Sequence, residues 1–241
     1  MNDRNKNIPD FYIDDHAVLF ACLAERAIKS FGNRGRMAVI EGVSIYCRER
    51  GLRMAMRCLA DGEPLSGKNY VVYGEWVDVR GWSKSERVAT SPNLRTNMTV
   101  CGWCDVWKKY GLLEYGAIYC DWADENLVYG FNPELKLVMG NVMSRLGGPC
   151  EFDWVSCTFE DDAEAGAMAS RRAELIPRVT KDFLYHTGHL LSAFKRVFLL
   201  SFGLVEGRAL VDGALARYGE LLGEEKIAVL EEESRKNFLE V

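Results

Sequence analysis

Apolar residues recur at helical spacing along the first part of the chain. From Asp14 to about Phe31 they lie three or four positions apart, and Asp14 or Asp15 is available as the N-terminal cap. A second helix is predicted over about 34–59, with Gly51 as a point of interruption because glycine costs about 1 kcal/mol relative to alanine in a helix. The stretch 61–68 holds two Gly and one Pro and predicts the turn that ends a helical hairpin.

The period then changes from that of helices to that of strands. Segments rich in β-branched and aromatic residues, or alternating in polarity, predict four strands at 70–79, 94–101, 134–143 and 150–159. Two helices are expected between the second and third strands, over 105–113 and 119–129. From Asp161 onward the chain is rich in Ala and Leu and predicts helix to the end, with a break at Pro177.

These elements predict an α+β fold, with an antiparallel sheet of about four strands flanked by N-terminal and C-terminal helices. The predicted organisation is one domain over 1–241. It comprises a helical hairpin at 14–60, a sheet-containing catalytic core at 68–160 and a C-terminal helical segment at 161–241.

Two distant segments resemble each other. Ser30-Phe31-Gly32 is followed by Gly35, Tyr46 and Gly51, and Ser201-Phe202-Gly203 is followed by Gly207, Tyr218 and Gly223. One interpretation is that amphipathic helices entered through a Gly turn look alike by chance. The other is a duplicated helix-turn-helix unit that packs on either side of the sheet.

Composition narrows the partners. The 241 residues carry a formal net charge of −5, which argues against nucleic acid and anionic membranes as partners. No apolar run approaches the roughly 20 residues of a membrane span. The polar, acidic segment 1–15 lacks the features of a secretory signal, so we expect a cytoplasmic protein. We expect a small-molecule substrate and no cofactor. The sequence leaves open whether the protein forms a homo-oligomer.

Eight cysteines stand out, because a chain of this length needs no disulfide or metal to fold. In a reducing compartment they are candidates for packing, metal ligation or nucleophilic chemistry. Cys101-Gly102-Trp103-Cys104 follows a predicted strand and opens a predicted helix, as a redox motif does. Cys120 and Cys150 would complete a four-thiol zinc site with this pair, although no second CxxC is present.

The other reactive side chains gather between 95 and 154. Arg95 and Asn97 share one face of the second strand, which is either exposed to solvent or lines a pocket. On the last strand Glu151 and Asp153 share a face opposite Cys150, Phe152 and Trp154. His186 and His189 share a helix face, for which a buried or capping role is favoured over a metal site.

A family resemblance rests on this block. Cys101, Tyr119-Cys120-Asp121, Gly130-Phe131-Asn132-Pro133-Glu134-Leu135, Gly147 and Cys150-Glu151-Phe152 occur in the order seen in the L-2-amino-thiazoline-4-carboxylic acid hydrolase family. The likeness covers about 20–154. Cys104, which creates a CxxC, and Trp103, which replaces a small or Pro residue expected after Cys101, depart from the family pattern. A weaker likeness links the chain to vinyl reductase-type small-molecule-binding domains.

The resemblance implies a hydrolase acting on carbon–nitrogen bonds of a cyclic amidine or amide. Its substrate would be a small C=N-containing ring such as a 2-aminothiazoline carboxylate, opened to an N-carbamoyl-cysteine-like product. Such a reaction needs a nucleophile, a proton donor and an anchor for the carboxylate. The alternatives are a non-catalytic sensor module of the vinyl reductase type and a zinc or thiol-redox protein using Cys101 and Cys104.

Candidate roles follow from these needs. Cys120 or Cys101 would attack as a thiolate, or Asp121 would activate water. Asp153 is the candidate acid, and Arg95 with Asn97 would hold the carboxylate. The catalytic candidates are Cys120, Asp121, Cys101, Asp153 and Cys150, and the substrate-binding candidates are Arg95, Asn97, Asn132, Trp154 and His186.

Overall fold

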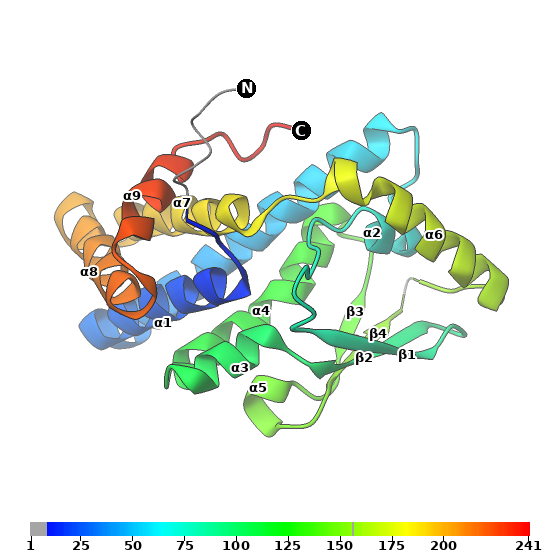
Figure 1. Cartoon of the computed structure of the whole chain (residues 1–241), viewed down its shortest axis with the longest axis horizontal. Helices are drawn as coiled ribbons and strands as arrows, with labels where there is room; N and C mark the ends of the chain where they lie inside the picture. The colour runs from blue at the N-terminus through cyan, green and yellow to red at the C-terminus, as the bar shows by residue number, and fades with distance from the viewer. Residues whose placement is uncertain (1–8, 156) are drawn as a thin grey trace. The chain divides into compact units, whose positions relative to one another are not determined.

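The computed structural model describes residues 9–155 and 157–241, so the beginning of the polar segment expected to lack a secretory signal lies outside the described residues. Figure 1 shows helices at both ends of the chain, and the part of the chain between them forms a four-stranded antiparallel sheet, which confirms the α+β class. The elements in chain order are α1 (Ile13–Ala60), α2 (Gly67–Val72), β1 (Lys84–Ala89), β2 (Leu94–Val100), α3 (Gly102–Lys109), α4 (Leu113–Phe131), β3 (Leu137–Met139), α5 (Met143–Leu146), β4 (Cys150–Trp154), α6 (Asp162–Val179), α7 (Phe183–Phe202), α8 (Leu204–Leu222) and α9 (Glu225–Glu233).

The chain forms two compact units, each assembled from separate segments. Unit 1 comprises Met1–Val43, Asp105–Gly116 and Asp182–Asn237. Unit 2 comprises Ser44–Cys104, Ala117–Lys181 and Phe238–Val241. Helices α1, α3 and α4 therefore contribute residues to both units.

Unit 1 contains the glycine corners of the two similar segments found in the sequence, whereas Tyr46 and Gly51 of the first segment belong to unit 2. Gly32 turns the chain inside α1 with φ of 55°, and Gly203 turns it between α7 and α8 with φ of 86°. Both angles lie in the left-handed region that favours glycine. Phe31 and Phe202 stack with ring centroids 4.3 Å apart, and the Arg34 guanidinium donates to the Ser201 carbonyl. The two corners therefore contact each other, and the expectation that they pack on either side of the sheet is wrong.

A buried carboxylate ties the start of α1 to the C-terminal helices of unit 1. Asp15 is fully buried and accepts hydrogen bonds from the Tyr218 hydroxyl at 2.6 Å, the Lys226 ammonium at 2.7 Å and the Tyr12 backbone N–H at 2.8 Å. Burial raises the pKa of Asp15, while Lys226, Tyr218 and Tyr12 oppose that rise. These hydrogen bonds give Asp15 a structural role in unit 1.

Unit 2 is built on the antiparallel sheet, whose strand order is β1-β2-β4-β3. Arg95 lies opposite Asp153 and Asn97 opposite Glu151 in the pairing of β2 with β4. Leu94 is buried, whereas Arg95 and Thr99 are exposed, so the polar face of β2 is the solvent-facing one. The predicted alternation along β2 and β4 is confirmed.

The predicted strand at 70–79 is wrong. The Ser66 side chain accepts from the Asn69 backbone N–H and caps α2, which ends at Val72. The chain from 73 to 83 has no helix or strand, and Asp78 accepts the backbone N–H groups of Arg80 and Ser83. The first strand is instead β1, a charged and exposed edge strand that lacks apolar alternation.

The other strands are shorter than predicted, with β3 covering only Leu137–Met139 and β4 ending at Trp154. The predicted helix to the end of the chain is interrupted at 180–182, at Gly203 and at 223–224, and it ends at Glu233. The predicted break at Pro177 is wrong, since Pro177 lies inside the last turn of α6. No helix in the described parts of the chain is long and apolar enough to cross a bilayer.

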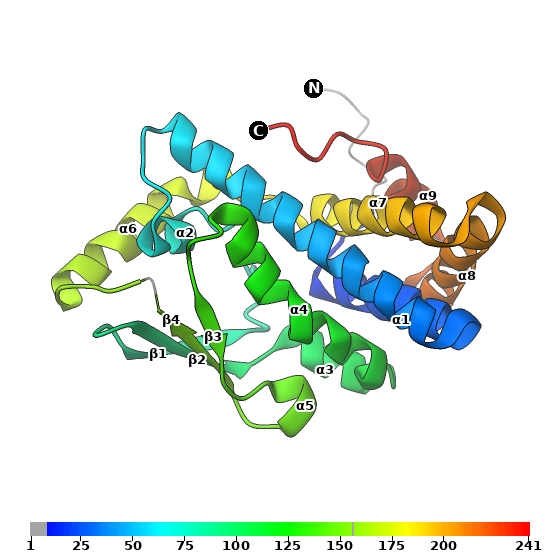
Figure 2. The same cartoon turned by 180° about the vertical axis from the view of Figure 1, so that it is seen from behind.

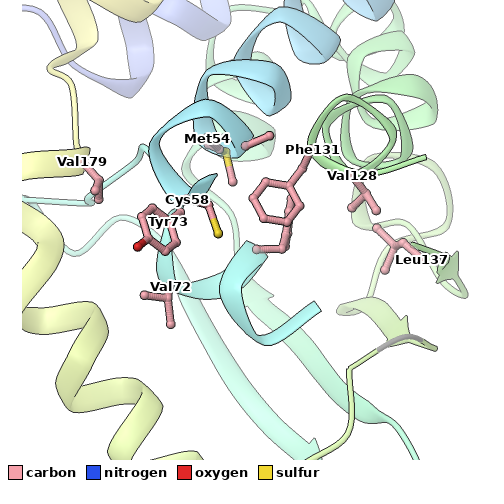
Figure 3. Close-up of a cluster of buried hydrophobic side chains, with 10 residues drawn as sticks. Met54, Cys58, Val72, Tyr73, Val128, Phe131, Leu137 and Val179 are labelled. Carbon is pink, nitrogen blue, oxygen red and sulfur yellow. The ribbon is translucent and has the colours of Figure 1, made fainter. Parts of the chain in front are cut away.

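The apolar core of unit 2 forms where α1, α2, α4 and β3 meet. Figure 3 shows Met54 and Cys58 from α1, Tyr73 after α2, and Phe131 from α4 directed at one another. Burial of such side chains, at about 25 cal/mol per Å² of apolar area, is the main stabilising contribution to this unit.

Two glycines let α1 and α4 cross at close range. A Cβ atom on Gly51 would overlap the Leu127 carbonyl oxygen, and one on Gly130 would overlap the Arg48 carbonyl oxygen. Figure 2 shows α4 running beside the C-terminal half of α1. Gly51 therefore does not interrupt the helix, because its role is to allow this crossing.

Candidate active site

A buried arginine on α1 is the first element of the candidate site. Arg50 is 2% exposed, and its guanidinium lies 3.9 Å from the ring centre of Trp76 and 5.5 Å from that of Tyr46. Its one hydrogen bond with the described residues is a long one, from Nε to Glu75 Oε2 at 3.4 Å. The terminal nitrogens of a buried guanidinium are thus left with donor capacity, which is costly unless an acceptor fills it.

Glu75 does not neutralise Arg50, because two other arginines of α1 engage it more closely. Arg53 donates to both Glu75 oxygens, at 2.9 and 2.8 Å, and Arg57 donates to Oε1 at 2.7 Å. Arg53 also donates to the Phe238 carbonyl at 2.7 Å. Three buried cations therefore surround one buried carboxylate, which leaves an excess of positive charge beside Arg50.

Asp124 on α4 is the second element. It is half-buried, and its carboxylate forms no hydrogen bond and no ion pair with residues 9–155 or 157–241. Burial raises the pKa of Asp124 to about 6, with Arg50 lowering it and Glu125 raising it further. A carboxyl group with a pKa near neutrality can serve as a general acid or base.

The residues around this pair come from α1, α2 and α4. Tyr119 and Cys47 influence each other's pKa, and Asp124 and Arg50 both influence the pKa of Tyr70. Burial raises the pKa of Tyr70 and Tyr119 above the ordinary range, so both phenols stay neutral. We call the following set the Arg50–Asp124 cluster: Tyr46, Cys47, Arg50, Tyr70, Tyr119, Cys120 and Asp124.

Cys120, Cys101 and Cys150 are brought together by the fold. Cys120 lies one helical turn before Asp124, and Cys101, Asp124 and Cys150 all influence its pKa. Burial raises that pKa well above the ordinary value, although the Ser144 hydroxyl opposes the rise. Cys150 accepts the Met143 backbone N–H at 3.3 Å. A buried thiol with a raised pKa is a poor nucleophile.

Cys101, the first cysteine of the CxxC motif, has a structural role. The Cys101 sulfur accepts the backbone N–H groups of Cys104 and Trp103, as an N-terminal cap of α3 does. Burial nevertheless raises the pKa of Cys101 to about 11. All eight cysteines are free thiols. Among the residues that the structure describes, no group of three or more His, Cys, Asp or Glu side chains is placed to hold a metal ion.

Four other candidates from the sequence are not members of the cluster. Asp121 is exposed and paired with Arg145, whose Nε donates at 3.0 Å. Arg95 is exposed on the outer face of β2, with Asn97 half-buried on that face. Asp153 is half-buried on the same face, and its Oδ1 is enclosed without a partner among the described residues.

The remaining substrate-binding candidates have identifiable structural contacts. Asn132 donates to the Leu65 carbonyl at 2.8 Å and accepts the Glu134 backbone N–H at 3.0 Å, which fixes the turn after α4. Trp154 donates to Thr96 Oγ1 at 3.1 Å. His186 is fully buried in α7 of unit 1, whereas the Arg50–Asp124 cluster belongs to unit 2.

A hollow beside Tyr70 is too small for a ring-shaped ligand. It is lined by Gly67, Tyr70, Val128, Leu135, Lys136, Trp154 and Cys157. Its volume is about 10 Å³, which is room for about one water molecule. The apolar hollow is therefore a packing feature of unit 2.

Arg50 and Asp124 were not among the candidates that residue patterns suggested, for a physical reason. Each lies among other charged residues of its helix, a pattern that usually indicates a solvated face. A usable signal was present, since Arg50, Arg53 and Arg57 recur at helical spacing on the face that also carries Met54. Charges on an apolar stripe must be paired or functional, because unpaired buried charge is expensive.

The sequence matches the model of one protein family, described as L-2-amino-thiazoline-4-carboxylic acid hydrolase, over residues 13–154. No curated protein and no solved structure matches the chain. The matched residues span more than half of the chain and include Arg50, Asp124 and the three neighbouring thiols. The chain belongs to the L-2-amino-thiazoline-4-carboxylic acid hydrolase family.

Proposed function

We propose that the protein opens a small cyclic amidine that bears a carboxylate, and that it does so at the Arg50–Asp124 cluster. The observation that carries the proposal is a carboxylate, Asp124, that has no hydrogen bond or ion pair among the described residues and whose pKa the buried Arg50 guanidinium lowers. Arg50 lowers the pKa of Asp124, but the two side chains form no ion pair, and the acidic partner of Arg50 is Glu75. Two opposite charges kept apart in a buried setting suit a ligand that carries the complementary charges at its two ends.

A 2-aminothiazoline carboxylate is such a ligand. Its amidine-like C=N group takes up a proton and becomes a cation, while its carboxylate is an anion. Arg50 would bind the carboxylate through the two terminal nitrogens that Glu75 leaves available. Asp124 would face the cationic ring carbon. The excess of buried arginine over Glu75 favours an anionic substrate group at this position.

The proposed chemistry uses water as the nucleophile. Ionised Asp124 takes a proton from a water molecule while the oxygen of that water adds to the ring carbon of the C=N bond. Collapse of this adduct forms the carbonyl group and breaks the bond from that carbon to the ring sulfur. Asp124 returns its proton to the departing sulfur, and the remaining proton of the adduct's hydroxyl group, equivalent to the one that the amidine had taken up, is released to solvent. The product is an N-carbamoyl-cysteine-type compound with a free thiol.

Water is preferred over a thiolate because of the electrostatics around Cys120. Burial raises the pKa of Cys120 well above its ordinary value, so the group stays a neutral thiol at neutral pH. Asp124, with a pKa of about 6, is mostly ionised under the same conditions. The group in the reactive state is therefore the carboxylate.

Incubation of the purified protein with 2-amino-thiazoline-4-carboxylic acid tests the proposal. Wild type is expected to release a titratable thiol, which distinguishes carbon–sulfur cleavage from cleavage of the ring carbon–nitrogen bond. Asp124→Asn is expected to lower kcat by about 10²–10⁴. Cys120→Ser is expected to keep turnover within about tenfold.

The matched control is Asp121→Asn, which changes a neighbouring, exposed carboxylate of the same helix. Full turnover by Asp124→Asn together with loss of turnover in Cys120→Ser would contradict water activation by Asp124. Binding of the compound by wild type without any ring opening would favour the non-catalytic small-molecule-binding module instead.

A further inference from the structure

Trp103, the central aromatic residue of the CxxC motif, contacts the ring that covers Arg50. Trp76 and Trp103 stack with centroids 4.7 Å apart and an interplanar angle of 21°. The Arg50 guanidinium lies 3.9 Å from the centre of the same Trp76 ring. One indole face has no room for both groups at these distances, so Arg50 and Trp103 take opposite faces of Trp76.

Trp76 needs such support because of where it lies in the chain. It belongs to the segment 73–83, which has neither helix nor strand. Arg172 holds its backbone through a hydrogen bond from Nη2 to the Trp76 carbonyl at 3.0 Å. This contact fixes the main chain, whereas the orientation of the indole depends on what packs against its two faces.

Trp103, by contrast, lies in the first turn of α3, and the motif's other residues fix that turn. The Cys101 sulfur accepts the N–H groups of Trp103 and Cys104. Gly102 donates its N–H to Ser83 Oγ at 3.4 Å, and the Cys104 side chain is buried. The motif therefore has the means to hold one indole in a defined place.

We infer that Trp103 is a positioning residue for substrate binding, which holds Trp76 flat against Arg50 so that the guanidinium presents its terminal nitrogens to the substrate carboxylate. This inference rests on the proposed function, since it assigns Arg50 to the carboxylate. It gives the CxxC motif a role in which neither sulfur forms a disulfide or binds a metal. The aromatic at 103 acts through Trp76 and does not itself contact the substrate.

The test compares Trp103→Leu with wild type on two compounds. With 2-amino-thiazoline-4-carboxylic acid, Trp103→Leu is expected to raise KM about tenfold and to leave kcat within about twofold, since the guanidinium–indole contact contributes to binding. With 2-amino-2-thiazoline, which lacks the carboxylate, the two proteins are expected to have the same KM. Trp103→Phe is expected to restore most of the affinity.

Two controls separate positioning from general damage. Trp122→Leu removes an indole from the exposed face of α4 and is expected to change neither constant. Cys101→Ser preserves an acceptor at the helix start and is expected to keep the wild-type KM, whereas Cys101→Ala is expected to raise it. An unchanged KM in Trp103→Leu, in a protein whose Arg50→Lys variant does raise KM, would overturn the inference and leave the proposed function standing.

Calorimetric titration of 2-amino-thiazoline-4-carboxylic acid into the Asp124→Asn background keeps the two failures distinguishable. If wild type shows no ring opening, the proposed reaction is wrong. A dissociation constant that Trp103→Leu raises about tenfold would nevertheless support the positioning role. Equal dissociation constants with and without Trp103 would reject it.

Discussion

Asp15, which is buried, and Asp124, which is half-buried, have the same cause of a raised pKa and very different surroundings. Asp15 in unit 1 accepts hydrogen bonds from Tyr218, Lys226 and the Tyr12 backbone. Asp124 in unit 2 has no such partner among the described residues. Burial is the largest influence that raises the pKa of each. The fully paired carboxylate joins elements of its unit, whereas the unpaired one has lone pairs available for a ligand.

The difference shows how a buried charged group that stabilises the fold differs from one that is available for chemistry. A buried charge that has lost water and gained no partner is held at a cost in folding free energy. Such a cost is typical of groups that act on a substrate. Arg50 shares this property only in its terminal nitrogens, which lack acceptors among the described residues, because its Nε donates to Glu75 at 3.4 Å while Arg53 and Arg57 are engaged more closely with Glu75.

Replacement of Asp124 by Asn is expected to have the largest effect on this comparison. The pKa of Asp124 is raised from 3.8 to about 6, so the unfolded chain loses this proton at lower pH than the folded protein does. The free energy of unfolding therefore falls as pH rises through 4–6, by about 3 kcal/mol. Asp124→Asn should avoid this loss and raise the free energy of unfolding at pH 8 while removing turnover.

Urea unfolding of wild type and Asp124→Asn at pH 4 and pH 8 provides the measurement. The two proteins should differ little at pH 4 and by about 3 kcal/mol at pH 8. A variant less stable than wild type at pH 8 would mean that the carboxylate is paired in solution.

Gly51→Ala is expected to separate Asp124 from Arg50 without changing either group. The added methyl would overlap the Leu127 carbonyl oxygen and force α1 and α4 apart. We expect a loss of about 2–3 kcal/mol in the free energy of unfolding and a lower kcat/KM. Gly166→Ala is the control, because nothing lies near its Cβ position in α6, and it should be neutral or slightly stabilising.

Asp15→Asn should act in the opposite direction from Asp124→Asn. It leaves the Lys226 ammonium without its counter-charge and weakens the bond to Tyr218, so we expect the free energy of unfolding to fall by about 2 kcal/mol. Turnover per folded molecule should stay at the wild-type level. A thermal melt together with an active-site titration checks both parts. Stabilisation by this substitution would show that the two aspartates are alike after all.

Asp121→Asn is expected to have the smallest effect. The carboxylate is exposed and paired with Arg145 across the surface, and such pairs contribute about 0–1 kcal/mol. Neither kcat nor KM should change by more than about twofold. A large loss of kcat would return Asp121 to the role of water activator expected from the sequence.

Much of the fold follows from the strand and helix patterns of the sequence. The positions of β2 and β4 follow from residue spacing, as do the two predicted helices that form α1 on either side of the kink at Gly32. The structure of the segment 70–79 does not follow from its composition. Tyr70, Val72 and Tyr73 are buried side chains of a short capped helix and the turn after it, and local composition does not distinguish such a helix from a buried strand. β1 begins with four polar residues and shows no apolar alternation, so it gives no strand signal.

The candidate site was less accessible to sequence reasoning. Cys101, Cys120 and Cys150 were expected to come together, and the fold places them near one another. Arg50 and Asp124 meet only because Gly51 and Gly130 permit the close crossing of two helices that are far apart in sequence. That geometry depends on tertiary packing, which residue spacing within one helix does not reveal.

The pH dependence of kcat/KM for ring opening of 2-amino-thiazoline-4-carboxylic acid tests the central claim most directly. If ionised Asp124 activates water, kcat/KM rises with pH and levels off above about 6, where the pKa of this carboxyl lies. The same inflection should be absent from the residual activity of Asp124→Asn. A wild-type profile that is flat from pH 5 to 8, or an inflection near 6 that persists in Asp124→Asn, would contradict the assignment of Asp124 as the catalytic base.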